Sequence, residues 1–212
     1  MPKARRPSAF FHSRRDRPLG VFKKIGLLGG TFDPPHLAHL VLAQTALEQL
    51  ELDAVWFLPS FIPPLKRDKK ISSFTHRLRM VRLAIRGNRR FGVSVIEKEK
   101  KGTSYTVATL VLLCEKHPDV RFYLILGSDN LDLFKKWKEP EKVFSMAAPV
   151  FARRPNFSEK APTWLKHAAW LDTPRLEISS TNLHARVSAG HSIRYLVPDA
   201  VEKYIRKNHL YL

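Results

Sequence analysis

The sequence predicts an α/β fold in which a doubly wound parallel sheet carries helices on both of its faces. Short apolar runs of the kind that form buried parallel strands recur along the chain. Amphipathic or apolar segments of helical length separate these runs. Glycines directly follow the first and fourth runs, where the carboxyl ends of strands in an open α/β sheet bind ligands.

Composition limits the class of protein. A chain of 212 residues with 44% hydrophobic residues suits one globular domain, or one domain with a small appendage. Cys114 is the single cysteine, so an internal disulfide is excluded and we expect a reducing, cytoplasmic compartment. No apolar stretch approaches the roughly 20 residues that a membrane helix needs. The N-terminus lacks the apolar core of a secretory signal.

The net charge of +18 is concentrated at the N-terminus. Residues 1–24 hold eight Lys/Arg and one acidic residue. Three prolines and the absence of periodicity predict that residues 1–22 form a basic flexible arm, followed by one α/β domain over residues 23–212. The arm is interpreted as a solvated tail or translated upstream sequence, a nucleic-acid or acidic-surface contact, or an organelle transit peptide. The basic remainder favours anionic substrates.

The first predicted element is a strand at Ile25–Leu28, a short uninterrupted apolar run that suits burial on both faces. Gly29 and Gly30 follow it. Residues without a Cβ let the backbone turn sharply or approach a ligand closely. The strand and its glycine turn therefore predict a place where a ligand meets the main chain.

A helix expected from about Pro35 to Leu50 carries two histidines in its first turn. His36 and His39 are three residues apart, so both lie on one face of that helix. Taken alone, such a pair is more often a helix cap and a surface side chain. Behind a glycine turn, helix-start amides and the positive end of the helix dipole favour a phosphate site. A zinc site is not predicted, because a third ligand and the glutamate of His-Glu-x-x-His are absent.

The remaining elements follow from apolar runs and their boundaries. Pro59 ends the second run, and Ser72 or Ser73 is expected to cap the amphipathic helix beyond the lysine-rich loop 60–73. Thr103 or Ser104 is the expected cap of a later apolar helix. The expected strands span residues 25–28, 54–58, 91–96, 120–126 and 149–152, with a last strand from 170–171 and 175–178. The expected helices span residues 35–50, 74–86, 107–114, 180–190 and 199–208.

Gly127 and Asp129 follow the fourth apolar run. An ionised carboxylate accepts hydrogen bonds only, so Asp129 can accept from both hydroxyls of a ribose. Ser128 or Asp129 can equally begin the next helix as its N-cap, and the two roles are compatible.

At Gly29–His39 the sequence GGTFDPPHLAH resembles the (T/H)xGH signature of the nucleotidyltransferase α/β-phosphodiesterase superfamily. More narrowly, residues 24–212 are similar to the bacterial nicotinate mononucleotide adenylyltransferase family. Residues 178–184 resemble the second signature, Ile-Ser-Ser-Thr-x-x-Arg. Three positions depart from the family pattern: Ala38 replaces glycine, Leu65 replaces the histidine of Pro-Pro-His-Lys, and His184 replaces arginine.

The resemblance implies a Rossmann-like fold of the nucleotidyltransferase type with a small C-terminal helical part. It also implies that ATP and nicotinate mononucleotide react to give nicotinate adenine dinucleotide and pyrophosphate, with Mg²⁺ bound mainly through the ATP phosphates. The implied catalytic residues are His36, His39 and Lys66. The implied ATP-binding residues are Gly29, Gly30, Thr31, Phe32, Gly127, Ser180, Thr181 and His184. The implied mononucleotide-binding residues are Thr106, Asp129, Trp137 and Arg154.

Alternatives remain open at this point. Without the resemblance, Thr106 is an ordinary helix-cap residue and Trp137 packs in the core. A sister adenylyltransferase of the pantetheine-phosphate type is a second function, although Ser-Tyr-Thr at 104–106 and Trp137 eight residues after Asp129 count against it. A nucleic-acid-binding protein on a weakened enzyme scaffold is a third. The preference for nicotinate or nicotinamide and the oligomeric state are not predicted.

Overall fold

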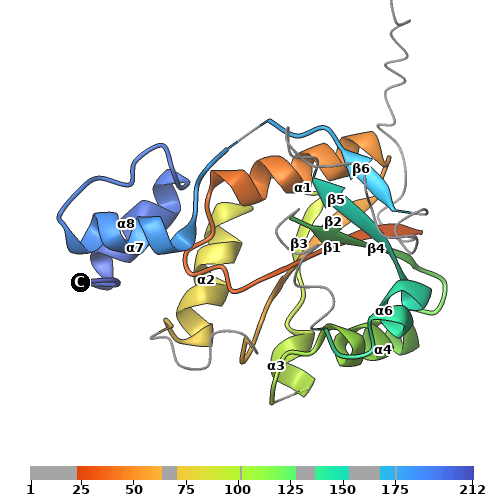
Figure 1. Cartoon of the computed structure of the whole chain (residues 1–212). Helices are drawn as coiled ribbons and strands as arrows, with labels where there is room; N and C mark the ends of the chain where they lie inside the picture. Colours follow the sequence, from red (N-terminus) through yellow and green to blue (C-terminus); the bar gives the residue numbers. More distant parts are fainter. Residues whose placement is uncertain (1–22, 64–70, 101, 128–136, 153–167, 175) are drawn as a thin grey trace, which may run out of the picture.

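A computed structural model describes residues 23–63, 71–100, 102–127, 137–152, 168–174 and 176–212 (Figure 1). Within these residues, a six-stranded sheet has the order β3-β2-β1-β4-β5-β6, and every neighbouring pair is parallel. The strands are β1 (Lys24–Gly30), β2 (Ala54–Pro59), β3 (Phe91–Val93), β4 (Arg121–Leu126), β5 (Ala147–Ala152) and β6 (Ala169–Leu171). This order confirms the predicted doubly wound sheet.

The strand order reverses between β1 and β4, the two central strands. Leu28 of β1 pairs with Phe57 of β2 on one side and with Ile125 of β4 on the other. The chain runs outward from this point in both directions; we refer to the carboxyl ends of β1 and β4, where sheets of this topology bind ligands, as the crevice. The fold therefore places the glycine-rich end of β1 where open α/β sheets bind ligands.

Helices cover both faces of the sheet (Figure 1). Their bounds are α1 (Leu37–Gln49), α2 (Phe74–Ala84), α3 (Ile96–Lys100), α4 (Thr106–Lys116), α6 (Pro140–Met146), α7 (Ser180–Ser188) and α8 (Asp199–Lys207). On one face, Leu47 of α1 and Val81 of α2 pack in a cluster with Phe57. On the other, Leu110 of α4 and Val143 of α6 belong to the second cluster. None of the described helices has both the length and the apolar character needed to cross a bilayer.

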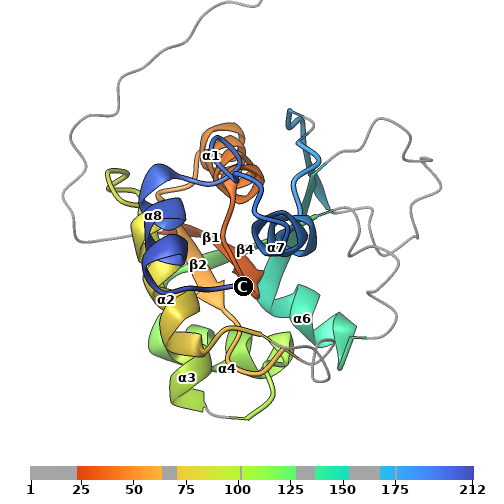
Figure 2. The same ribbon diagram turned by 90° about the vertical axis from the view of Figure 1, so that its left-hand side faces the viewer.

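The C-terminal helices form a separate apolar cluster at one end of the sheet (Figures 1 and 2). Leu183 of α7 and Ile205 of α8 are 1% exposed and pack in this cluster with Met80 of α2. The backbone N–H of Leu37 donates to the carbonyl of Leu196 at 3.0 Å. The start of α1 is therefore in direct contact with the segment that joins α7 to α8.

The structure corrects two predicted elements. The third strand ends at Val93 instead of residue 96, and residues 96–100 form the short helix α3, which the sequence analysis did not predict. Ser94 accepts a hydrogen bond from the Ile96 N–H, and the Ile96 side chain is 4% exposed, so burial of this isoleucine directs the chain into a turn. The last strand comprises residues 169–171 only, and residues 176–178 lie outside it.

The predicted cap of α4 is also wrong. Tyr105 occupies the N-cap position, and its side chain makes no cap hydrogen bond. The hydroxyl of Ser104 instead accepts from the backbone N–H of Phe61 at 2.8 Å. Ser104 therefore ties the start of α4 to the chain beyond β2. For α2, one of the two predicted caps is confirmed, since Ser73 accepts from the His76 N–H.

Candidate active site

The turn between β1 and α1 leaves open space on one side and is tightly packed on the other. A Cβ at Gly29 would meet no atom within 4 Å, whereas a Cβ at Gly30 would lie 3.1 Å from the Phe32 ring. Phe32 is 1% exposed and has φ +52°, in the left-handed region that side chains other than glycine seldom adopt. The turn therefore buries Phe32 beneath the site and leaves surface open beside Gly29.

His36 and His39 lie together at the start of α1, as the sequence predicts. Their ring centroids are 3.7 Å apart, with the planes tilted by 33°. His36 is the N-cap residue of α1, and its backbone N–H donates to Nδ1 of His39 at 3.2 Å. The edge of the His39 ring meets Phe32, with centroids 4.9 Å apart. The backbone of the first turn and a buried aromatic ring thus fix the orientation of His39.

The hydrogen bond from His36 also fixes the tautomer of His39. Nδ1 accepts a hydrogen bond from the backbone N–H of His36, so in the neutral ring the hydrogen resides on Nε2. Nε2 is consequently a hydrogen-bond donor. This is the property that contact with a phosphate oxygen requires.

His36 is neutral at pH 7. Burial lowers the pKa of its imidazole to about 4, because the charged form loses solvation. The side chain is 6% exposed, and within the described part of the chain its Nδ1 has no hydrogen-bond partner. The His36 ring is therefore an uncharged, buried part of the turn, packed against the ring of His39.

The start of α7 lies against the same turn. Ser179 caps α7 by accepting from the Asn182 N–H, and the next residue, Ser180, donates its hydroxyl hydrogen to the carbonyl of Pro34 at 3.0 Å. Two helix N-termini, those of α1 and α7, therefore meet at one turn, and their dipoles favour an anion there. Thr181 is exposed in the first turn of α7.

His184 also contacts the turn. Its Nε2–H donates to the backbone carbonyl of Asp33 at 2.7 Å, and the same nitrogen lies 3.8 Å from the Asp33 carboxylate. The imidazole stacks on the ring of Tyr211, with centroids 3.9 Å apart. His184 is thus at the site, but in this structure its N–H is bonded to the backbone.

A buried arginine that the sequence analysis missed binds the backbone of the turn, close to the buried carboxylate of Asp33. Arg77 of α2 is 2% exposed and Asp33 is 4% exposed. Burial lowers the pKa of the Arg77 guanidinium, and the nearby Asp33 carboxylate raises it. The guanidinium donates to the carbonyls of residues 31, 60, 61 and 72 at distances from 2.8 to 3.3 Å. In sequence, Arg77 resembles the other cations of an amphipathic helix, so no local signal identifies it.

The predicted mononucleotide-binding residues are only partly described. Thr106 is the first residue of α4 and is half-buried, and Trp137 packs against the core cluster that contains Leu110. Lys138 lies over the ring of Tyr105 at 5.4 Å, which brings the start of α4 close to the chain around residue 137. The remaining predicted site residues, Lys66, Asp129 and Arg154, lie outside the described residues.

Gly127 follows β4 at the level of the β1 turn. It is two residues beyond Ile125, which pairs with Leu28, and Gly30 is likewise two residues beyond Leu28. The backbones at the ends of the two central strands therefore lie side by side, as a ligand spanning the crevice requires. In the ranges that the structure describes, no group of three or more His, Cys, Asp or Glu side chains could hold a metal ion.

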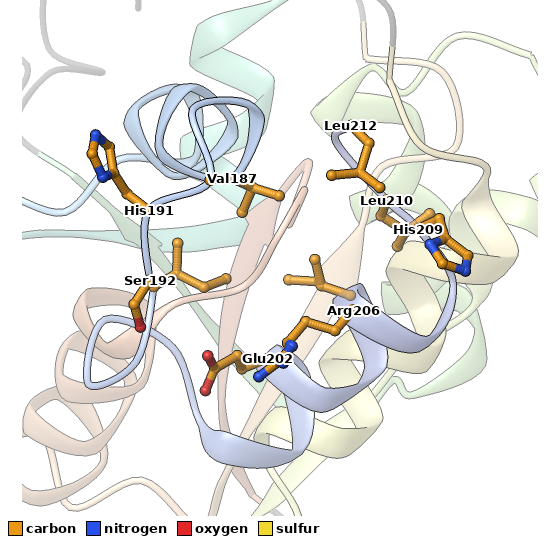
Figure 3. Close-up of a pocket in the computed structure, with 11 residues that line it drawn as sticks. Val187, His191, Ser192, Glu202, Arg206, His209, Leu210 and Leu212 are labelled. Carbon is orange, nitrogen blue, oxygen red and sulfur yellow. The ribbon is translucent and has the colours of Figure 1, made fainter.

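A pocket of ≈ 450 Å³ lies elsewhere, between α7 and α8 (Figure 3). None of the predicted site residues lines it, so we do not assign the nucleotide site there. Its lining residues are Val187, Gly190, His191, Ser192, Ile193, Glu202, Ile205, Arg206, His209, Leu210 and Leu212.

Comparisons with known proteins agree with this geometry. Residues 27–186 match the family model described as cytidylyltransferase-like. The chain is 43% identical over 189 residues to a Salinibacter ruber protein named "Probable nicotinate-nucleotide adenylyltransferase", covering 88% of this chain and 97% of the relative. It is 38% identical to the nicotinate-nucleotide adenylyltransferase of Bacillus subtilis, covering 89% of this chain and 98% of the relative.

The fold has counterparts among solved structures. Plasmodium falciparum nicotinic acid mononucleotide adenylyltransferase, solved as a complex with NaAD, superimposes with a TM-score of 0.77 at 23% identity. The match covers 89% of this chain and 97% of the solved chain. Identity at this level supports the fold, and the bacterial relatives supply the family. Fold, signature turn and relatives together show that this chain belongs to the nicotinate-nucleotide adenylyltransferase family, within the cytidylyltransferase-like proteins.

Proposed function

We propose that this chain joins ATP and nicotinate mononucleotide to give nicotinate adenine dinucleotide and pyrophosphate. The observation that carries the proposal is the pair of fixed imidazoles, His36 and His39, at the N-terminus of α1 beside the crevice between β1 and β4. The names of the bacterial relatives support this choice of substrates over those of a pantetheine-phosphate adenylyltransferase. We place the reaction in the cytoplasm, where the single Cys114 stays reduced.

The reaction is a displacement at phosphorus. An ionised oxygen of the mononucleotide 5′-phosphate attacks the α-phosphorus of ATP and forms a new P–O–P bond. The bond from the α-phosphorus to the oxygen that bridges to the β-phosphate breaks, and its electron pair leaves with pyrophosphate. No proton has to be removed from the nucleophile, so the protein contributes alignment and charge stabilisation.

Each site residue has a proposed role in that displacement. His39 donates Nε2–H to the phosphates of ATP, and His36, whose ring lies 3.7 Å from that of His39, is proposed to contact the same groups. The helix-start amides at Ser180 and Thr181 neutralise charge on the triphosphate. Lys66 is proposed as the cation that reaches the phosphates.

We assign the second substrate to the other side of the crevice. Asp129 binds its ribose, Arg154 binds its phosphate, and Thr106 and Trp137 bind its pyridine ring and carboxylate.

The residues present fit a magnesium ion that is carried by ATP. Asp33 is the carboxylate at the turn, and its two oxygens already accept from the Tyr211 hydroxyl and the Ser72 N–H. Mg²⁺ is commonly held through substrate phosphates and retained waters. Bound in that way, it neutralises phosphate charge, while His36, His39 and the helix amides orient the triphosphate.

A pyrophosphate-release assay tests the proposal. ATP is supplied with each candidate second substrate in turn. Pyrophosphate release is expected with nicotinate mononucleotide and absent with phosphopantetheine. We expect His39→Ala to lower turnover by about 100-fold or more, since it removes a donor aimed at developing charge. His191→Ala is the matched control, because His191 is exposed and lies just beyond the C-terminal end of α7. It is expected to keep full turnover. Full activity of His39→Ala with an unchanged melting temperature would refute the assignment.

A further inference from the structure

The side chain of Asp33 joins the C-terminal end of the chain to the turn that presents the two histidines. The Tyr211 hydroxyl donates to Oδ1 of Asp33 at 2.7 Å, and the backbone N–H of Ser72 donates to Oδ2 at 3.0 Å. Asp33 is 4% exposed, so these contacts replace its lost hydration. Tyr211 is 178 residues away in sequence and belongs to neither signature.

Tyr211 is held firmly in this orientation. Its φ is +68°, a backbone conformation that disfavours residues with a side chain and persists where surrounding contacts enforce it. Burial and the adjacent Asp33 carboxylate raise the pKa of the Tyr211 hydroxyl far above its ordinary value, so this hydroxyl remains a proton donor. The flat face of the ring is covered by His184, with the two planes 25° apart.

His184 contacts the same residue from the other side. Its Nε2–H donates to the Asp33 backbone carbonyl at 2.7 Å, and the ring is sandwiched against Tyr211. Tyr211 and His184 therefore hold the side chain and the backbone of one residue, three positions before His36. An error in that residue's placement shifts both imidazoles, because the chain between them is a short turn with two prolines.

We propose that Tyr211 and His184 are positioning residues, which set the orientation of residues 31–36 through Asp33 and so align the two histidines with the phosphates of ATP. The inference rests on the proposed function of the histidine pair. In this assignment His184 acts on the protein backbone instead of on the phosphates. The C-terminal residues are then part of the catalytic apparatus although they touch no substrate.

Tyr211→Phe is the decisive variant, because it keeps the ring stacked on His184 and removes only the hydroxyl. Tyr204→Phe is its matched control: it removes another tyrosine hydroxyl of the C-terminal part, which bonds to His76 at 2.9 Å and does not contact the turn. We expect Tyr211→Phe to lower kcat about tenfold, with KM for nicotinate mononucleotide changed less than about twofold, since small misplacements of catalytic groups cost that much or more. Tyr204→Phe is expected to keep kcat within about twofold.

His184 variants test the second half of the inference. A glutamine at this position retains an N–H that can donate to the Asp33 carbonyl, so His184→Gln is expected to keep more activity than His184→Ala. Tyr211→Phe combined with His184→Ala should lose less than the product of the two single losses, because both act through Asp33. Independent, multiplicative losses, or equal loss in the Gln and Ala variants, would contradict a shared positioning role.

Hydrogen exchange of the peptide covering residues 31–36, measured without nucleotide, separates this inference from the proposed reaction. Faster exchange in Tyr211→Phe but not in Tyr204→Phe supports the positioning role, even if the unchanged protein shows no adenylyl transfer. Equal exchange in all three proteins, or equal kcat in the two variants, overturns it.

Discussion

At the scale of single residues, the site depends on a histidine that folding keeps uncharged. Burial lowers the pKa of His36 to about 4, from about 6.5 in an unfolded chain. A neutral ring tolerates the dry environment under the turn, and a bound phosphate beside it would raise the pKa again. The residue is therefore poised to respond to the ligand, and its titration couples to folding.

This coupling predicts how stability depends on pH. The unfolded chain binds a proton at His36 below about pH 6.5, whereas the folded chain resists it down to about pH 4, so the unfolded state binds more protons in this window. His36 therefore contributes stability above about pH 6.5 that is lost as pH falls toward 4, by up to about 3 kcal/mol. Urea unfolding from pH 7.5 to 4 measures it, and His36→Asn is expected to flatten the curve. Parallel curves for the two proteins would contradict the shift.

Arg77 gives a second residue-scale prediction, on stability. Its guanidinium satisfies four carbonyl oxygens and faces the buried Asp33 carboxylate. Arg77→Ala leaves these four carbonyl oxygens without their donor, and we expect a loss of about 3–5 kcal/mol in the free energy of unfolding, since each unsatisfied buried acceptor costs about 1–3 kcal/mol. Arg82→Ala, at an exposed position of the same helix, is the control and should change stability by less than about 0.5 kcal/mol. Urea unfolding of both variants at pH 7 measures the two changes in the free energy of unfolding.

At the scale of elements, the turn between β1 and α1 contains two glycines whose surroundings differ. Gly30→Ala places a methyl group about 3.1 Å from the Phe32 ring, which in turn packs on His39. We expect kcat to fall about tenfold, since the displaced ring moves the imidazole. Gly29→Ala adds a methyl group to open space, so its melting temperature should not change.

The same pair of variants tests where the nucleotide lies. If ATP packs on Gly29, the added methyl group raises KM for ATP while leaving kcat within about twofold. Steady-state kinetics on both variants measures this, and an unchanged KM for ATP in Gly29→Ala would place the nucleotide away from this part of the turn.

The sequence predicts a helix or strand well where the apolar residues of that segment follow a single pattern. The buried runs at β1, β2 and β4 and the amphipathic pattern of α2 fix the sheet and its helices. Prediction was wrong where local signals compete. Ser104 has the residue type of a helix cap, yet its hydroxyl bonds to Phe61, 43 residues away. The partner of Ser104 is determined by the residues that pack around the start of α4 in the folded chain, and no local sequence pattern indicates it.

The site divides in the same way. His36 and His39 could be predicted because one helix turn carries both and because they belong to a known signature. Three side chains come close together only when the sheet, α2 and the C-terminal helices have packed: Asp33, Arg77 and Tyr211. No periodic sequence pattern indicates that they interact. Polar contacts between residues so far apart in sequence can be identified only from the three-dimensional structure.

At the scale of the whole molecule, the C-terminal helices complete the site that the sheet begins. The apolar cluster of Leu183, Ile205 and Met80 holds α7 and α8 against α2, and the contact between Leu37 and Leu196 joins them to α1. The crevice between β1 and β4 thus has a wall that comes from the last fifth of the chain. We therefore expect core packing at a distance from the crevice to influence the turn through Ser180 and His184 of α7.

The last prediction concerns residues 1–22, which we propose to be dispensable for catalysis. The described site residues begin at Gly29, and the backbone N–H groups of Lys23 and Lys24 are held by the carboxylate of Asp53, so the domain has its own anchor at this end. Removing residues 1–22 deletes six Lys/Arg and one Asp, and lowers the net charge from +18 to +13. Turnover and both KM values should stay within about twofold.

Non-specific DNA affinity should respond instead, because it scales with the number of phosphates that cations neutralise. We expect the truncated chain to bind duplex DNA more weakly and with a shallower dependence of log K on log salt, by up to about 5 in slope. Fluorescence anisotropy with one duplex at several salt concentrations measures the slope for both proteins. Equal slopes would show that the arm does not contact the phosphates, and a loss of turnover would show that it belongs to the catalytic unit.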